Sequence, residues 1–117
     1  MEFIEYSKCS TCKKAKKFLI DNNIIFEDRE IKENIPTYKE INNWIKKYNI
    51  DINKLFNTSG LVYKNLNLKD KIKTMSDDEK IKLLSSNGML IKRPLLINNN
   101  YMLIGFKENI WKEYLDK

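Results

Sequence analysis

Two cysteines separated by two residues, Cys9 and Cys12, are the side chains of this sequence best suited to covalent chemistry. The thiolate is the reactive form of cysteine, and a helix N-terminus stabilises it through unpaired N–H groups and the helix dipole. A Cys-x-x-Cys pair at a strand-to-helix turn is typical of a redox motif. The segment Cys9-Ser10-Thr11-Cys12 therefore predicts thiol–disulfide chemistry, with Cys9 as nucleophile and Cys12, one helical turn later, as resolving thiol.

A simpler interpretation is that both cysteines are small buried hydrophobes. It suits Cys12, which falls on the apolar stripe of the predicted helix. It suits Cys9 poorly, because its sequence neighbours are polar. Lys8 and Lys13 are close enough in the sequence to add positive charge and favour the Cys9 thiolate.

The composition excludes several other chemistries. The 117 residues contain no histidine, which rules out a Cys-His dyad, a Ser-His-Asp triad and a His-containing zinc site, and two cysteines cannot complete a Cys-only zinc site. No apolar run approaches the roughly 18 residues of a membrane span, and the acidic start at Glu2 and Glu5 is unlike a secretory signal. We therefore expect one cytosolic domain, with no metal and no bound cofactor.

The net charge of +6 does not by itself indicate nucleic-acid binding. Lysines are scattered among acidic residues, and only Arg29 and Arg93 are arginine, so we attribute the charge to an overall Lys/Asn/Ile bias. The local cluster Lys13, Lys14, Lys16 and Lys17 is interpreted as the solvated face of a helix. We expect neither a direct nucleic-acid partner nor a membrane partner.

The segment that carries the motif has the pattern of a β-α-β unit. Apolar residues at 3–6 predict a strand, and a helix should follow through about residue 21. The buried stripe of that helix is expected to be Ala15, Phe18 and Leu19. Ile24-Ile25-Phe26 predicts a second strand, and a unit of this kind pairs parallel strands through a right-handed crossover.

The middle of the chain predicts helices, and the last third predicts a hairpin and a helix. Thr37 with Glu40 and Ser76 with Glu79 have the spacing of capping boxes, and residues 57–60 have the composition of a loop. Two β-runs at 95–97 and 101–104, joined by an Asn-rich turn, predict a hairpin. The last helix is expected to place four apolar residues on one face: Ile110, Trp111, Tyr114 and Leu115.

The dipeptide Arg93-Pro94 before the hairpin is a second candidate. A cis proline is usually a deliberate feature of a tight turn, and the planar guanidinium can bind an anion bidentately, as lysine cannot. A surface arginine followed by a trans proline at the start of a strand explains the dipeptide equally well.

Five segments together resemble the arsenate reductase ArsC/Spx family, in the right order and over essentially the whole chain. They are Tyr6-Ser7-Lys8-Cys9-Ser10-Thr11-Cys12-Lys13-Lys14-Ala15, Asn57-Thr58-Ser59-Gly60, Ser86-Asn87-Gly88-Met89-Leu90, Lys92-Arg93-Pro94-Leu95-Leu96 and Gly105-Phe106-Lys107-Glu108. The short length and the segment at 57–60 are most similar to the YffB/YusI-type branch.

The resemblance implies an α/β, thioredoxin-like three-layer fold in one domain over residues 1–117. Its parts would be the β-α-β unit, a helical insertion over about residues 35–88, the β-hairpin and the C-terminal helix. It implies that Cys9 is the nucleophile and that Arg93-Pro94, with Pro94 cis, faces the cysteine loop. The residues expected to bind substrate or thiol are Ser10, Thr11, Lys13, Arg93 and Pro94.

Three functions of that family are open. The main expectation is a cytosolic thiol–disulfide oxidoreductase that works with glutathione or a similar thiol on a small thiol or protein disulfide. The alternative is an Spx-like redox sensor that binds RNA polymerase, although the chain ends at Lys117 without that branch's basic tail and has no glycine at its polymerase contact. The third is an arsenate reductase, although Asn57 and Gly105 occupy two positions that those enzymes fill with arginine.

Overall fold

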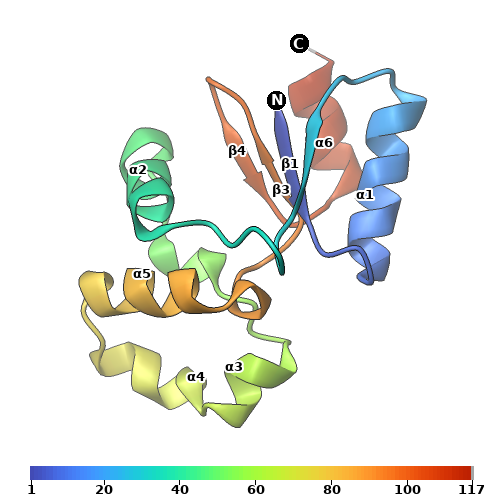
Figure 1. Ribbon diagram of the computed structural model, residues 1–117. Coiled ribbons are helices and arrows are strands. Elements are labelled where there is room, and N and C mark those ends of the chain that lie inside the picture. The colour runs from blue at the N-terminus through green and yellow to red at the C-terminus, as the bar shows by residue number, and fades with distance from the viewer. Residues whose placement is uncertain (117) are drawn as a thin grey trace. The chain divides into compact units, whose positions relative to one another are not determined.

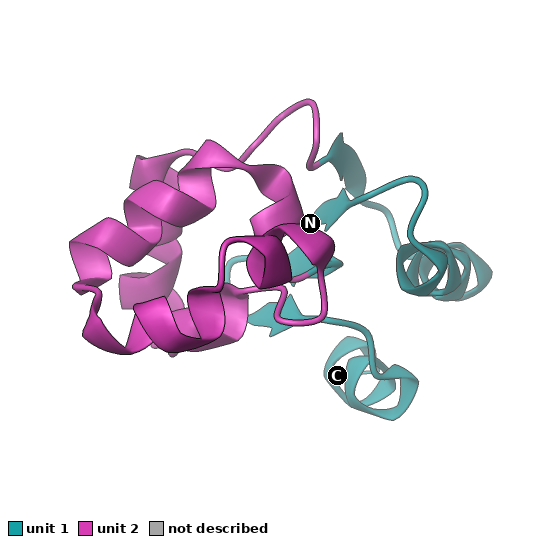
Figure 2. Ribbon diagram, turned by 90° about the horizontal axis from the view of Figure 1, so that it is seen from below, with its two compact units in different colours: residues 1–30, 93–117 teal, residues 31–92 magenta. Residues whose placement is uncertain are grey.

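The computed structural model describes residues 1–116 and divides into two compact units (Figure 1, Figure 2). The sheet unit comprises Met1–Glu30 and Arg93–Lys117, and the helical unit comprises Ile31–Lys92. Both cysteines and the Arg93-Pro94 dipeptide belong to the sheet unit.

The sheet unit contains four strands in the order β2-β1-β3-β4. Their bounds are β1 Glu2–Glu5, β2 Glu27–Glu30, β3 Leu95–Ile97 and β4 Met102–Ile104. β1 pairs in parallel with β2, whereas β1 with β3 and β3 with β4 are antiparallel. The predicted parallel β-α-β unit and the predicted hairpin are therefore both confirmed.

Two helices, α1 (Ser10–Asp21) and α6 (Glu108–Leu115), cover the same face of this sheet (Figure 1). Side chains from both helices and from three strands form a core between the helices and the sheet. Its buried members are Phe3, Ala15, Leu19, Leu96, Leu103 and Trp111. The Trp111 ring meets the edge of Phe3 at a centroid distance of 6.3 Å, so α6 is fixed to the central strand by aromatic packing.

The position of β2 differs from the sequence prediction. Ile24-Ile25-Phe26 precedes the strand, and β2 consists of the four charged residues Glu27, Asp28, Arg29 and Glu30. Asn23 adopts a left-handed conformation with φ of 59°, and Ile24 N–H still donates to Leu19 O, so this run closes the end of α1. Ile24 and Phe26 pack against the core, whereas Ile25 is 91% exposed.

The apolar face predicted for the last helix is narrower than expected. Trp111 is buried and Leu115 packs against the core, but Ile110 and Tyr114 are exposed. Tyr114 instead packs against Tyr101 with the two rings tilted, at a centroid distance of 4.9 Å, next to the hairpin turn.

The helical unit consists of short helices. They are α2 Tyr38–Tyr48, η1 Ile52–Leu55, α3 Leu61–Asn65, α4 Leu68–Lys71, η2 Ile72–Thr74, α5 Asp77–Ser86 and η3 Gly88–Leu90. Both predicted capping boxes are confirmed, because the side-chain oxygens of Thr37 and Ser76 each accept from the N–H three residues later, and their own backbone N–H groups donate to the carboxylate of that glutamate. Trp44 joins Ile41 on the buried face of α2, which the sequence analysis did not anticipate.

Two features of the helical unit explain segments that the sequence analysis singled out. Asn57 N–H donates to Leu90 O at 2.8 Å, and the Asn57 side-chain oxygen accepts from the Ser59 hydroxyl. These hydrogen bonds hold the loop at residues 57–60 against Leu90. A Cβ at Gly88 would lie 2.4 Å from the carbonyl oxygen of Ile31, which explains a glycine at that position. These segments serve local packing.

Candidate active site

Cys9 occupies the N-cap position of α1, as the sequence predicted. Its backbone is extended, its N–H donates to Tyr6 O at 2.9 Å, and its carbonyl accepts from Lys13 N–H. The hydrogen bond to Tyr6 closes the turn between β1 and α1 and holds the sulfur at the helix terminus. Cys9 is partly exposed to solvent.

Cys12 lies one turn into α1 and is fully buried. It shares the inward face of the helix with Ala15 and Leu19, which anchor that face in the core. Both cysteines are free thiols. One thiol is therefore open to solvent and its partner is shielded from it, within a single helical turn.

The environment separates the pKa values of the two thiols. Burial opposes ionisation of Cys9, but the N–H and the thiol of Cys12 favour its thiolate, and so does the N–H of Thr11. These N–H groups act through their dipoles, because no directed side-chain cap hydrogen bond forms at Cys9. The net result is a pKa of Cys9 below its ordinary value. Burial raises the pKa of Cys12 to about 12, and its interaction with Cys9 contributes to that rise.

Arg93 is the charged side chain with the largest lowering effect on the pKa of Cys9, and it acts in the same direction on Cys12. Its guanidinium lies over the Tyr6 ring, 5.1 Å from the ring centroid. The same tyrosine accepts the Cys9 N–H, so one residue supports both the nucleophile and the cation beside it.

The Arg93–Pro94 peptide bond is cis, as predicted. Pro94 O accepts the Gly105 N–H at 2.8 Å, and Gly105 O accepts the Trp111 indole N–H at 3.0 Å. Gly105 has φ of 74°, a conformation that favours glycine. These two hydrogen bonds in series fix the Arg93-Pro94 loop to the end of the hairpin and to α6.

The other predicted site residues lie on the first turns of α1. Ser10 and Thr11 begin the helix and are exposed, and Lys13 is exposed on its second turn. Of the four lysines predicted to form a solvated face, Lys16 departs from that expectation because it forms ion pairs with the sheet. Lys17 pairs within the helix, with Asp21 at 2.6 Å.

A cluster of charged residues beneath α1 was not anticipated. Glu5, the last residue of β1, is only 4% exposed, and Lys16 Nζ lies 3.2 Å from its Oε2 as an ion pair without hydrogen-bond geometry. The same Nζ lies 2.5 Å from Asp28 Oδ2 on β2. Burial is the main cause that raises the pKa of Glu5 to about 7, and a hydrogen bond with Asp28 adds to the rise. Burial of Asp28 would raise its pKa, but the interactions of Asp28 with Glu5 and Lys16 outweigh this effect and lower the pKa.

Sequence reasoning missed Tyr6 and Glu5 as members of this region. The burial of Glu5 could have been predicted from the sequence. Glu5 lies two residues after Phe3, and alternation in a strand places both side chains on the same face. Tyr6 was assigned to the strand for its apolar ring, although it lies outside β1, whose last residue is Glu5.

Neither a metal site nor a membrane span is found among residues 1–116. No group of three or more His, Cys, Asp or Glu side chains there is arranged to hold a metal ion. Within the same residues, no helix has the length and apolar character needed to cross a bilayer. The chemistry that the site offers is that of two thiols, one cation and a helix N-terminus.

Comparison with known proteins places this geometry in a family. The sequence profile of the ArsC family matches residues 4–114. The chain belongs to the ArsC family. The predicted α/β, thioredoxin-like fold is also confirmed, because the crystal structure of an ArsC family related protein from Bacteroides fragilis superposes with a TM-score of 0.91. That structure is 46% identical and the match covers 96% of this chain and 94% of that one.

Two curated relatives are from Bacillus subtilis. YusI is 43% identical over 97% of this chain and 96% of its own length. Regulatory protein MgsR is 30% identical over 91% of this chain and 82% of its own length. This ArsC family member is thus similar over nearly its full length to a short relative and to a protein named for regulation.

The raised pKa of Glu5 predicts a pH dependence of stability. Because the folded-state pKa of Glu5, about 7, exceeds its ordinary value of 4.5, this group contributes most stability below pH 4.5 and loses it as pH rises through 7. We expect the free energy of unfolding to fall by on the order of 2 kcal/mol between pH 5.5 and 8. Urea titrations at both pH values measure the difference.

Glu5→Gln keeps the shape of the side chain but cannot ionise, so this variant should lose most of that pH dependence. The control is Glu27→Gln, an exposed carboxylate of β2, which should retain the wild-type profile. An unchanged fall in stability with Glu5→Gln would show that another group titrates in this range.

Arg93 should control the reactivity of Cys9. We expect Arg93→Met to raise the pKa of Cys9, because it removes the cation that favours the thiolate. The rate of alkylation of Cys9 by iodoacetamide, followed from pH 5 to 10 by mass spectrometry, gives the titration curve. Lys13→Met is the matched control and should move the curve less. An equal shift in both variants would contradict a specific role for Arg93.

Proposed function

We propose that this ArsC family member is a cytosolic thiol–disulfide oxidoreductase. The observation that carries the proposal is the contrast between two thiols one helical turn apart. Cys9 is accessible and has a lowered pKa, whereas Cys12 is buried and has a raised pKa. A nucleophile and a resolving thiol need these different properties. The nucleophilic thiol must be ionised and accessible, whereas the resolving thiol must stay protonated until a mixed disulfide has formed.

The proposed cycle has three steps. The Cys9 thiolate attacks one sulfur of a substrate disulfide, forms a mixed disulfide and releases the other sulfur as a thiolate. Cys12 then loses its proton to solvent or to the departing thiolate and attacks Cys9 Sγ, which forms the Cys9–Cys12 disulfide and releases the second substrate thiol. Two molecules of glutathione or a similar low-molecular-weight thiol reduce this disulfide and leave as their own disulfide.

The interaction between the two thiols supports this order of events. While Cys9 carries negative charge, the neighbouring thiol donates toward it and remains protonated. Once Cys9 is bonded to substrate sulfur, that negative charge is gone, and the part of the rise in the Cys12 pKa that came from Cys9 disappears with it, while burial continues to raise that pKa. Arg93 lowers the pKa of both thiols and would favour each thiolate in its turn.

The remaining predicted site residues would hold the substrate. Arg93 offers a planar guanidinium for an anionic group such as a glutathione carboxylate, with the Tyr6 ring behind it. Ser10, Thr11, Lys13 and the Pro94 loop would line the approach to Cys9. Arsenate reduction would depend on Arg93 alone, because Asn57 and Gly105 occupy the two positions that arsenate reductases fill with arginine.

Cysteine variants test the cycle. Cys9→Ser should lower the glutathione-dependent reduction of hydroxyethyl disulfide by at least about a thousandfold, because the nucleophile is lost. Cys12→Ser should accumulate a glutathione adduct on Cys9, since the resolving thiol is missing. Intact-protein mass spectrometry across glutathione redox buffers should show a reversible internal disulfide in the wild type.

Two results would contradict the proposal. Turnover retained by Cys9→Ser would remove Cys9 as the nucleophile. If the wild type forms no internal disulfide under conditions that oxidise Cys-x-x-Cys pairs, the motif is structural and only the fold follows from the family.

A second candidate is a redox-sensing regulator that binds RNA polymerase. The likeness to MgsR favours it, since that relative is named as a regulatory protein and shares 30% identity over most of this chain. The same Cys9–Cys12 pair would then act as the sensor, and formation of its disulfide would change a binding surface.

Polymerase binding separates the two candidates. Under the oxidoreductase proposal, immobilised chain should retain no purified RNA polymerase in either redox state. The measurement compares wild-type chain treated with diamide or with dithiothreitol, and Cys9→Ser/Cys12→Ser as the variant locked in the thiol-free state. Retention of polymerase in one redox state of the wild type, absent from the other, would establish the regulator instead.

A further inference from the structure

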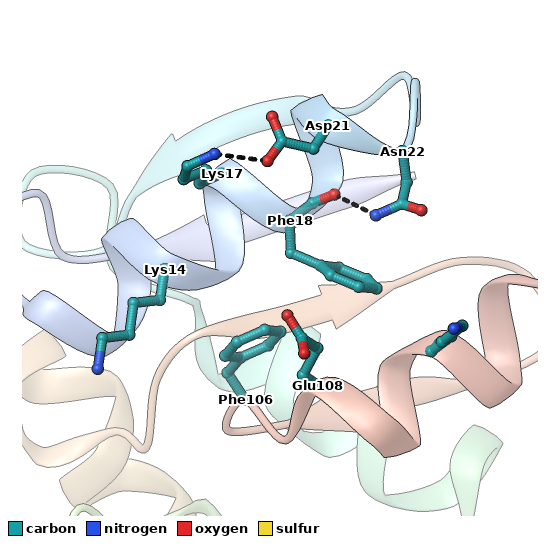
Figure 3. A pocket seen from close by; sticks show the side chains of 8 residues that line it. Lys14, Lys17, Phe18, Asp21, Asn22, Phe106 and Glu108 are labelled. Carbon is teal, nitrogen blue, oxygen red and sulfur yellow. Dashed lines mark hydrogen bonds and ion pairs between the residues drawn. The ribbon is translucent and has the colours of Figure 1, made fainter.

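A groove runs between α1 and α6 on the outside of the sheet unit (Figure 3). It encloses about 520 Å³, within the range of roughly 300–1,000 Å³ that is usual for ligand sites. Its walls come from α1, from α6 and from Phe106, which precedes α6. We call it the α1–α6 groove, and its lining includes Lys14, Lys17, Phe18, Phe106, Glu108 and Lys112.

The floor of the α1–α6 groove is aromatic. Phe18 and Phe106 face each other across it at a centroid distance of 5.7 Å, and both are only half-buried (Figure 3). Phe106 is held edge-on by Trp111 at 4.9 Å, so the floor is fixed by the core beneath it. Half-exposed, immobile rings of this kind suit an apolar side chain of a ligand.

The rim of the groove is mainly basic. Lys17 is neutralised by Asp21, and Glu108 is the one further carboxylate among the lining residues. Lys14 and Lys112 stand on the two helices, exposed and without an ion-pair partner among residues 1–116. An occupant with carboxylates beside an apolar group would match both the rim and the floor.

The groove begins close to the nucleophile. Cys9 caps α1, and Lys14 follows five residues later, which is about 7.5 Å along the helix axis. Phe18 lies about 13.5 Å along the same axis. Because an extended chain advances about 3.3 Å per residue, a segment of four or five residues spans the distance from the reacting sulfur to the aromatic floor.

We propose that the α1–α6 groove binds the acidic, apolar segment beside the oxidised cysteine of a protein substrate. The inference rests on the proposed oxidoreductase function and adds a substrate class to it. Lys14 and Lys112 bind the carboxylates, the two phenylalanines receive the apolar side chain, and the substrate disulfide is thereby presented to Cys9.

The test uses peptides that carry a cysteine activated as its 2-thiopyridyl disulfide. The acidic probe has the sequence Glu-Phe-Glu-Gly-Cys-Gly-Glu-Phe-Glu. A second probe replaces each Glu by Gln, and a third replaces each Phe by Ala. Attack by Cys9 releases thiopyridone, whose absorbance gives a second-order rate constant. The neutral reagent 2,2′-dithiodipyridine, which has no peptide, reports the intrinsic reactivity of Cys9.

At low ionic strength the wild type should react about tenfold faster with the acidic probe than with the Gln probe, because the positive charges of Lys14 and Lys112 attract the carboxylates of the acidic probe. The Ala probe should also be slower than the acidic probe. Lys14→Glu/Lys112→Glu should abolish the preference for the acidic probe. Lys39→Glu/Lys73→Glu changes the net charge equally, in exposed lysines of the helical unit, and should retain the preference.

Three outcomes would overturn the inference: no preference in the wild type, a preference that survives in Lys14→Glu/Lys112→Glu, or an equal loss in the Lys39/Lys73 control. The last would mean that net charge alone attracts the probe. Failure of Cys9 to react even with 2,2′-dithiodipyridine is a different result, because it would remove the oxidoreductase proposal itself and the groove with it.

Discussion

The hydrogen bond from the Trp111 indole to Gly105 O is the contact on which the geometry of the site depends. Through Gly105 N–H it continues to Pro94 O, and the loop so fixed carries Arg93 over the Tyr6 ring. Trp111 itself is buried against Phe3 and Phe106. An aromatic side chain of the last helix thus sets the position of a cation that acts on a thiol near the start of the chain.

The two cysteines derive opposite properties from one helix. The N-cap position gives Cys9 the dipoles of free N–H groups and partial access to solvent, while the next turn places Cys12 on the stripe that α1 buries. No separate residue is needed to distinguish them, since the helical repeat does so. The packing of Ala15 and Leu19 holds both sulfurs at a fixed depth relative to the sheet.

Much of this arrangement could be predicted from local patterns. The strand-to-helix turn, the capping boxes and the hairpin each depend on a few neighbouring residues, and the structure confirms them. The placement of β2 failed because an apolar run was assigned to a strand. The strand was decided instead by pairing with β1, which begins at Glu2 and Glu27. Pairing between distant residues is not encoded in local composition.

The site was predictable where family motifs or helix periodicity reached it, as for Cys9, Cys12 and Arg93. Tyr6 also lies in a family segment, but its contact with Arg93 was not predictable, and neither was the Glu5–Lys16–Asp28 cluster, because these contacts join separate elements. Lys16 looked like another solvated lysine in a row of four. Only the position of two acidic residues on adjacent strands distinguishes it from Lys13 and Lys14.

The charged β2 strand has a consequence for how these molecules behave in a crowded solution. β2 lies at the edge of the sheet, and all four of its side chains are acidic or basic. An edge strand offers unpaired backbone groups to other chains, and charge along it discourages intermolecular sheet extension and aggregation. The unit that carries Cys9 therefore contains a sheet whose β2 edge resists self-association.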